Sequence, residues 1–118
     1  MNRITFSEDW DKLKDPRFTT IHSYRPDRER YYRGLVGSAF ILWRATGRSR
    51  WNWHKVGVAT LRSVRVVRPA DLPAADLHAD VLRGGEPVRT WEARLLAMDR
   101  AVLLEFENHT GLLAEAPP

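Results

Sequence analysis

Cysteine is absent from the 118-residue chain, and so are long hydrophobic runs. Without cysteine there is neither a disulfide framework nor a thiolate metal site, and the composition fits a reducing environment. The longest apolar run, Ala39–Trp43, is far shorter than the roughly 20 residues that span a membrane. Glu8 and Asp9 precede any apolar run, which argues against a secretory signal. We therefore expect a cytoplasmic protein with no membrane partner.

Motifs of common catalytic and cofactor chemistry are absent as well. The sequence has no phosphate-binding glycine loop and no G-x-S-x-G turn. The four histidines have no metal-ligand spacing such as HExxH, and Asp71, Asp76 and Asp80 are too widely spaced for one metal cage. The sequence thus predicts no metal site and no cofactor.

What is present is an ordinary globular composition with an uneven charge. Hydrophobic residues make up 43% and charged residues 29% of the chain, which predicts one domain over residues 1–113 and a frayed tail at 114–118. Residues 1–68 contain 15 of the 19 Lys and Arg but only 6 of the 15 acids, although the net charge is only +4. Such a field attracts polyanions, so nucleic acid, RNA in particular, is the expected partner. The alternative is a merely solvated basic face, since arginine excess also follows from a GC-rich genome.

The pattern of apolar residues, glycine and proline predicts an α+β fold. Alternation and β-branched residues indicate strands, and Gly84-Gly85 and the prolines separate the helices. The expected strands are Ile4–Phe6, Thr19–Tyr24, Ser38–Trp43, Lys55–Val67 (with Gly57 a possible bulge) and Ala101–Phe106. The expected helices are Glu8–Lys14, Ala74–Leu82 and Thr90–Ala97. Because the strands do not alternate regularly with helices, we expect a small, partly closed β-barrel of five to six strands with helices packed on one side.

Two basic segments contain aromatic residues. The first, residues 24–33, is interpreted as a flexible loop that grips phosphate, or else as a polar connection in which Asp27 and Glu29 pair with Arg28 and Arg30. The second, residues 43–55, has three tryptophans; Trp43 is expected in the core, whereas exposure and burial are equally compatible with the other two. The nucleic-acid-binding residues expected in these segments are Tyr24, Arg25, Arg28, Arg33, Arg44, Arg48, Arg50, Trp51, Trp53 and Lys55.

A third candidate group lies in the strand near residue 20. Thr20 and His22 are two residues apart, so they share one face of a strand. Arg17 is suited to hold a phosphate, Thr20 to donate a hydrogen bond, and His22 to stack on a base or transfer a proton. The alternative is a half-buried strand whose polar residues face solvent.

The element order and several segments resemble the ASCH family of the PUA-like superfold. The residues that carry the likeness are Ile4-Thr5-Phe6, Arg17-Phe18-Thr19-Thr20-Ile21-His22, the Gly34–Gly37 turn, Val56-Gly57-Val58-Ala59 and Leu103–Phe106. The likeness covers roughly residues 4–106 and is one of layout more than of motif. The family's glycine, lysine, glutamate and arginine fall on Asp15, Arg17, Thr20 and His22, so none is matched literally.

The resemblance implies a pocket for RNA between a barrel and its helices. An amidohydrolase-like subgroup uses a lysine, a threonine and a later glutamate, for which Thr20 and Glu86 are the matching candidates and Arg17 stands in place of the lysine. A guanidinium stays charged where an amine can lose its proton.

Three functions follow, in order of preference. The first is an RNA-binding module that holds single-stranded or flipped nucleotides in a basic cleft. The second is a small hydrolase with catalytic Thr20 and Glu86, acting as a weak ribonuclease or as an acetylcytidine amidohydrolase. The third is a barrel whose basic face meets an acidic protein.

Overall fold

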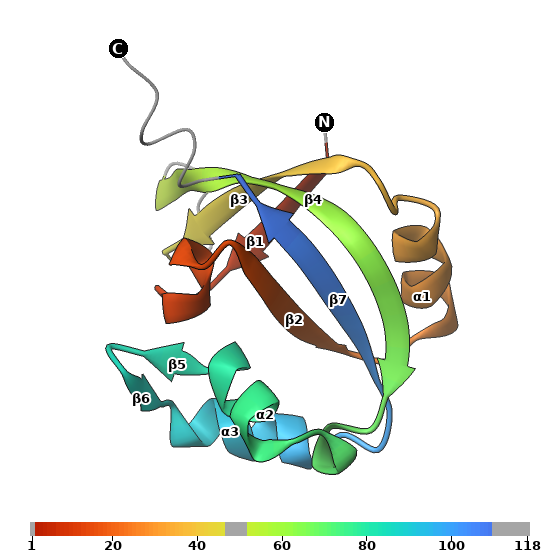
Figure 1. Ribbon diagram of the computed structural model, residues 1–118, viewed down its shortest axis with the longest axis vertical. Coiled ribbons are helices and arrows are strands. Elements are labelled where there is room, and N and C mark those ends of the chain that lie inside the picture. Colours follow the sequence, from red (N-terminus) through yellow and green to blue (C-terminus); the bar gives the residue numbers. More distant parts are fainter. Residues whose placement is uncertain (1, 47–51, 110–118) are drawn as a thin grey trace.

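A computed structural model describes residues 2–46 and 52–109 (Figure 1). The expected tail at 114–118 and three expected contact residues, Arg48, Arg50 and Trp51, lie outside these residues. The described elements, in chain order, are β1 (Asn2–Phe6), the 3-10 helix η1 (Asp11–Lys14), β2 (Arg17–Ser23), α1 (Pro26–Arg33), β3 (Ala39–Ala45), β4 (Trp53–Val67), the 3-10 helix η3 (Pro69–Asp71), α2 (Ala74–Asp80), β5 (Leu82–Arg83), β6 (Glu86–Pro87), α3 (Arg89–Leu96) and β7 (Ala101–Asn108).

Five of the described strands form one sheet in the order β1-β3-β4-β7-β2. The β1–β3 pair is parallel, and the other three pairs are antiparallel. The α+β class is therefore confirmed. The sheet is not closed into a barrel, because β1 and β2 remain as its two edges.

The sheet is nevertheless strongly curled, and its concave side holds an aromatic core. The rings of Phe18 on β2 and Phe106 on β7 stack with centroids 5.2 Å apart, and Phe106 also meets Phe40 on β3 edge to face at 5.4 Å. Phe6 on β1 approaches Phe18 at 6.3 Å, although these residues belong to opposite edges of the sheet. Burial of these rings from four strands supplies the driving force for the curl.

The 15-residue strand β4 follows this curvature with the help of two irregularities (Figure 1). Its register against β3 shifts between Leu42 and Trp43, which leaves Val56 as the extra residue beside Gly57. A second shift, against β7, occurs between Leu61 and Ser63. Bulges of this kind bend a strand and increase its twist. The bulge expected near Gly57 is thus confirmed within one residue.

The helices differ from the expectation in two places. The helix expected over Glu8–Lys14 is reduced to η1, because Trp10 is extended (φ −64°, ψ 137°) and the carboxylates of Glu8 and Asp9 bind distant arginines. The prediction of a flexible loop over residues 24–33 is wrong, since all but the first two of these residues form α1. Pro26 occupies the first turn of that helix, and the Glu29–Arg33 pair (2.7 Å) lies at i,i+4, so the charged run stabilises a helix.

The other two helices are confirmed with slightly different ends, and they lie apart from α1. The helices α2 and α3 cover the β2 side of the molecule, whereas α1 contacts β4 and β7 (Figure 1). The helices are therefore not all on one side. Between α2 and α3, the Gly84-Gly85 pair turns a short β5–β6 hairpin, and both glycines have positive φ (63° and 84°), as a tight two-residue turn requires.

Candidate functional site

A cleft of about 240 Å³ lies between the curled sheet and the two helices α2 and α3. We call it the inner cleft. Thr20 and His22 line it from the sheet, and Trp91 and Arg94 line it from α3. Side chains of β1, η1 and α2 complete the lining, so the site is assembled from segments that are far apart in the sequence.

The alternation of β2 decides which expected residues reach the inner cleft. Thr20 and His22 both line it, as their shared face predicts. Arg17 is exposed and lines a different cavity, together with Thr19. Odd-numbered residues of β2 point to the opposite face from even-numbered ones, and therefore Arg17 is not brought beside Thr20 and His22.

A buried ion pair at the wall of the cleft was not foreseen from the sequence. Lys12 Nζ donates to Asp80 Oδ1 and to the Thr19 carbonyl oxygen, each at 2.7 Å, and the two side chains are only 4% and 6% exposed. The Asp80 carboxylate also accepts hydrogen bonds from the Ile21 N–H and the Thr19 hydroxyl. Burial lowers the pKa of Lys12 and raises the pKa of Asp80, while the attraction between the two charges opposes both shifts.

This pair replaces a neighbouring strand along the free edge of β2. The Thr19 carbonyl and the Ile21 N–H are edge groups that β7 does not satisfy, and Lys12 and Asp80 supply the missing donor and acceptor. The ion pair thereby fastens η1 and α2 to the sheet and fixes the width of the inner cleft. No local sequence pattern signals it, because its partners are 68 residues apart.

His22 is the polar group of the cleft that the protein itself leaves unsatisfied. Its Nε2 atom is buried and has no hydrogen-bond partner among the described residues. The ring stacks on Tyr32 of α1 with centroids 5.9 Å apart. Burial, with smaller contributions from the Arg28 and Lys12 charges, lowers the pKa of His22 to about 4. The imidazole is therefore neutral near pH 7, and each ring nitrogen can serve as a donor or an acceptor according to the tautomer.

The aromatic wall of the cleft is formed by two tryptophans outside the segment expected to stack on bases. Trp10 and Trp91 meet edge to face with centroids 5.7 Å apart, and the Arg94 guanidinium lies 4.9 Å from the centroid of Trp91. Trp10 is buried, whereas Trp91 is half-buried. Both residues lie in apolar patterns typical of a core, and no local sequence pattern indicates that they share a cleft.

The tryptophan segment around residue 53 does not line the inner cleft. Trp53 is half-buried, its ring lies 6.4 Å from that of Trp43, and the Arg3 guanidinium lies 5.5 Å from its centroid. Trp43 is half-buried rather than fully in the core. Lys55 is exposed on β4.

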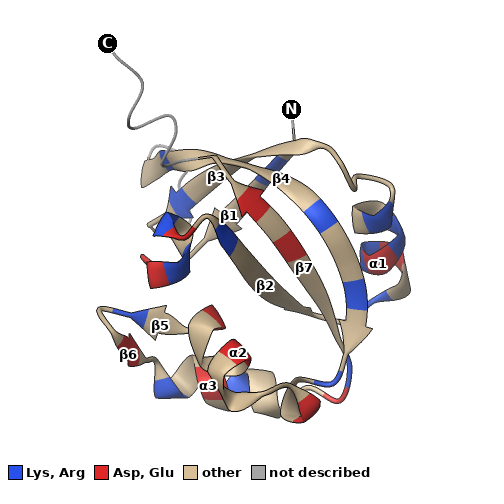
Figure 2. Cartoon of the chain, viewed as in Figure 1, with Lys and Arg blue, Asp and Glu red and all other residues tan. Residues whose placement is uncertain are grey.

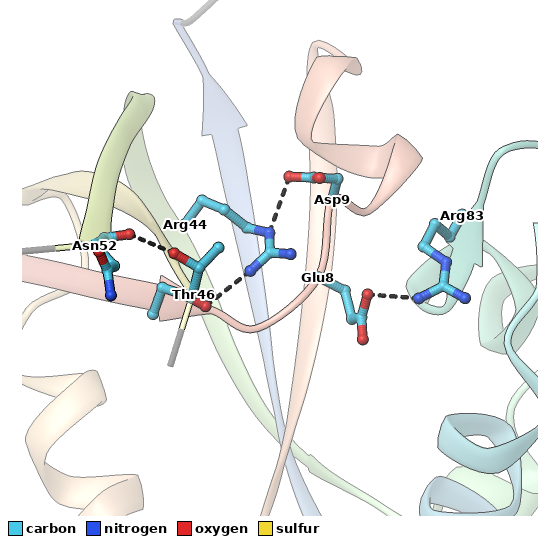
Figure 3. A network of polar contacts seen from close by, with 7 residues as sticks. Glu8, Asp9, Arg44, Thr46, Asn52 and Arg83 are labelled. Carbon is cyan, nitrogen blue, oxygen red and sulfur yellow. Dashed lines mark hydrogen bonds and ion pairs between the residues drawn. The ribbon is translucent and has the colours of Figure 1, made fainter. Parts of the chain in front are cut away.

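Glu86 lies on the β5–β6 hairpin, where it is exposed and does not line the inner cleft. The hairpin is attached at two points, to Asp11 at the start of η1 and to Glu8 in the segment before η1. The Asp11 carboxylate accepts the N–H groups of Gly84 and Gly85 at 2.9 and 2.8 Å, which holds the pKa of Asp11 below its usual range. Arg83 binds Glu8 at 2.6 Å (Figure 3).

Arg44 takes part in contacts within the protein close to the Glu8–Arg83 pair (Figure 3). Its guanidinium donates to Asp9 Oδ1 at 2.9 Å and to the Ala45 carbonyl oxygen at 2.7 Å. Beside it, the Thr46 hydroxyl donates to the Asn52 carbonyl oxygen at 2.7 Å. This arrangement connects the end of β3 to the segment between β1 and η1.

The expected residues of the segment 24–33 lie on α1 or directly before it. Arg28 donates to the Ser23 carbonyl and hydroxyl oxygens at 2.6 and 2.9 Å, and Arg25 pairs weakly with Asp27 at 3.4 Å. Arg33 binds Glu29 and the carbonyl of Val64, and Arg100 lies over the ring of Tyr24 at 4.0 Å. An open hollow of about 420 Å³ lies beside α1. Its lining residues are Arg25, Asp27, Arg28, Tyr31 and Tyr32.

The hollow beside α1 and the inner cleft are connected through one aromatic contact. Tyr32 lines the hollow and stacks on His22, which lines the cleft. Tyr31, next to it, is 56% exposed and meets Tyr32 edge to face. The hollow therefore places an exposed ring and two arginines next to a residue that contacts the wall of the cleft.

The described residues of the basic half of the sequence do not form one continuous basic face. Their arginines lie on α1, β2 and β4, while acids of β7 lie between β2 and β4 in the sheet (Figure 2). Glu107 of β7 binds Arg62 of β4, which lowers the pKa of Glu107. The charge excess of residues 17–68 is thus partly neutralised where these strands meet.

Within the described ranges, no group of three or more His, Cys, Asp or Glu side chains is arranged to hold a metal ion. No helix of residues 2–46 or 52–109 has the length and apolar character needed to cross a membrane. No protein family model matches the sequence, and neither a curated protein nor a solved structure is significantly similar to it.

Proposed function

We propose that the protein binds single-stranded nucleic acid, RNA in particular, and holds one base in the inner cleft. The observation that carries the proposal is the combination of an aromatic wall with a buried, unpartnered His22 Nε2. Proteins that take a base out of its stack hold it between aromatic or apolar side chains and hydrogen-bond its edge. The inner cleft offers both kinds of contact.

The size and chemistry of the cleft favour a single base over a larger ligand. Its volume of about 240 Å³ lies below the usual range for drug-sized ligands. Trp91 with Arg94 above it provides a face on which a planar ring stacks, and Thr20 and His22 provide hydrogen-bonding groups on the opposite side. Because His22 is neutral, it suits an uncharged base edge.

The hollow beside α1 supplies contacts for the neighbouring nucleotides. Arg25 and Arg28 suit phosphate groups, and the exposed ring of Tyr31 suits a second base. The Tyr32–His22 contact brings a wall residue of this hollow against a wall residue of the inner cleft. The proposed nucleic-acid-binding surface thus consists of the hollow beside α1 and the inner cleft next to α3.

The architecture is compatible with the ASCH likeness of the sequence. A curled sheet whose edge strands approach each other, with a cleft between sheet and helices, is the layout that a partly closed PUA-like barrel implies. We propose membership of that superfold on this ground. An RNA ligand and the absence of cysteine together favour a cytoplasmic location.

The test compares two arginines of the same helix. Arg94 lines the inner cleft, whereas Arg89 is exposed on α3 and pairs with Glu92. We expect fluorescence anisotropy with a short unstructured RNA to show salt-dependent binding. Arg94→Gln is expected to weaken binding and to reduce the slope of log Kd against log salt by about 1, while Arg89→Gln changes neither. Equal effects of both variants would indicate attraction by overall charge and contradict a site in the cleft.

A second candidate, hydrolysis of RNA or of a modified nucleoside, is favoured by one specific observation. Lys12 lines the cleft together with Thr20, and burial lowers the pKa of its amine. An amine of this kind can lose its proton, whereas the guanidinium of Arg17 stays charged. Binding ranks first because two N–H groups of the Lys12 ammonium hold Asp80 and the edge of β2. Glu86 is exposed outside the cleft and takes part only if the hairpin moves.

The hydrolase is tested by incubating the purified protein with acetylated cytidine and, separately, with unstructured RNA. Turnover that disappears in Thr20→Val but persists in Thr90→Val would establish catalysis at the inner cleft, because Thr90 is exposed at the start of α3 and does not line the cleft. Loss of turnover in Glu86→Gln would bring the hairpin glutamate into the reaction. Inactivity on both substrates, with RNA binding retained, leaves a binding module.

A further inference from the structure

A second cavity, of about 300 Å³, lies on the opposite face of β2, where α2 meets the sheet. We call it the outer cavity. Its base is apolar, since Ile21 and Leu103 are buried there and Leu72 is half-buried. Four charged side chains surround this apolar base: Arg17, Arg65, Asp76 and Glu105.

These four charges differ from the other charges of the same face because none of them has a partner within ion-pair distance, although the Arg17 charge contributes to the lowered pKa of Glu107, which lies opposite Arg17 in the β2–β7 register. None of them forms an ion pair or a side-chain hydrogen bond within residues 2–46 and 52–109. Neighbouring arginines are engaged, since Arg62 binds Glu107 and Arg68 lies 3.9 Å from Asp99. Charged residues near the outer cavity thus form ion pairs with each other, whereas two arginines and two acids at its wall form none.

The strand register places the opposite charges close together without pairing them. Glu105 is opposite Thr19 of β2 and Ser63 of β4, so it lies diagonally between Arg17 and Arg65. Diagonal neighbours in a sheet are about 7–8 Å apart, a spacing that long side chains can bridge, so the charged groups of Arg17, Glu105 and Arg65 can reach one ligand from neighbouring strands. Asp76 faces the same cavity from α2.

The signs of the four charges decide between classes of ligand. An inorganic anion near the arginines would be repelled by Asp76 and Glu105, and a simple cation near the acids would be repelled by Arg17 and Arg65. A zwitterion satisfies all four, and the apolar base adds a preference for a hydrocarbon side chain. A single amino acid is compatible with the volume of the cavity.

We propose that the outer cavity binds a free α-amino acid with an aliphatic side chain. The carboxylate contacts Arg17 or Arg65, the ammonium contacts Asp76 or Glu105, and the side chain lies on Ile21, Leu72 and Leu103. This site lies on the other face of β2 from the inner cleft, with Ile21 lining both, and it does not depend on the binding of nucleic acid.

The experiment is an NMR titration of the ¹⁵N-labelled protein with L-leucine. N-acetyl-L-leucine, which lacks the ammonium, and L-leucinamide, which lacks the carboxylate, are titrated in parallel. We expect leucine to cause saturable shifts of the Thr19, Ile21 and Leu103 amides, and both blocked compounds to bind at least about tenfold more weakly. Equal binding of the blocked compounds, or no saturable shift with leucine up to the millimolar range, would overturn the proposal.

Matched variants locate the site. Asp76→Asn and Arg65→Gln remove one charge of each sign from the cavity wall, and both are expected to weaken leucine binding about tenfold. Asp71→Asn and Arg68→Gln are the controls, since these exposed residues lie nearby in the chain and do not line the cavity. All four changes are at the surface, so the fold is expected to be retained. An equal loss in variants and controls would contradict the assigned site.

Discussion

The imidazole of His22 couples stability to pH at the scale of a single residue. Its pKa of about 4 in the folded protein lies below the ordinary value of 6.5. Between these two values the unfolded chain binds more protons than the folded one, so stability is complete above about pH 6.5 and is lost as the pH falls toward 4. We expect the free energy of unfolding to decrease by about 2 kcal/mol between pH 7 and pH 4.5 from this group alone.

Urea unfolding at the two pH values measures this effect. His22→Phe keeps an aromatic ring against Tyr32 and removes the titration, so the pH dependence is expected to shrink by the same amount. His54→Gln is the control, because His54 is exposed on β4. If wild-type protein and His22→Phe lose the same stability on acidification, His22 is not held neutral by burial.

The role of the Lys12–Asp80 ion pair also depends on burial. Asp80→Ala leaves the Lys12 ammonium buried without its partner and the Ile21 N–H without its acceptor, and we expect a loss of about 3–5 kcal/mol in the free energy of unfolding. Asp76→Ala, on the exposed side of the same helix, is expected to change stability by no more than about 0.5 kcal/mol. Similar effects of the two variants would show that the pair does not hold the edge of β2.

At the scale of elements, the sequence predicts best where one local rule governs. The period of two in β2 and β4 and the glycine and proline boundaries of α2 and α3 predict elements that the structure confirms. The helix α1 is different, because its charges fit both a phosphate-binding loop and a helix with an i,i+4 pair. The contacts of Tyr32 with His22 and Phe40, which the sequence does not reveal, explain why the helix packs against the sheet.

The β5–β6 hairpin is an element held by one carboxylate. Asp11→Ala removes the acceptor of the Gly84 and Gly85 N–H groups, so we expect these two amides to exchange with solvent faster. Hydrogen exchange followed by NMR measures this, with the buried β7 amides as the internal reference. Asp15→Ala serves as the control, since Asp15 is exposed and outside this contact. Unchanged exchange at both glycines in Asp11→Ala would mean that other contacts hold the hairpin.

At the scale of the whole molecule, the site depends on contacts that no local pattern contains. The parallel β1–β3 pair brings the N-terminal strand to one edge of the sheet, and the curl brings its Phe6 toward β2 at the other edge. Trp10 and Trp91, which are 81 residues apart in the chain, are likewise brought together by the fold. Thr20 and His22 were identified as a pair from their spacing, whereas the residues opposite them follow only from the tertiary fold.

The charge distribution of the folded protein also determines which surfaces are proposed to bind nucleic acid. Because acids of β7 separate the arginines of β2 and β4, nucleic-acid binding depends on the inner cleft and α1 rather than on a broad basic face (Figure 2). A modest salt dependence, set by a few phosphate contacts, is the corresponding expectation.

The most direct test is an NMR titration of the ¹⁵N-labelled protein with a short unstructured RNA. We predict that the largest shifts occur at the amides of Thr20, His22 and Arg94 and at the indole N–H of Trp91, with smaller shifts along α1. Shifts confined to other surfaces, such as the Trp53–Lys55 end of β4, or the absence of any shift, would contradict a base held in the inner cleft.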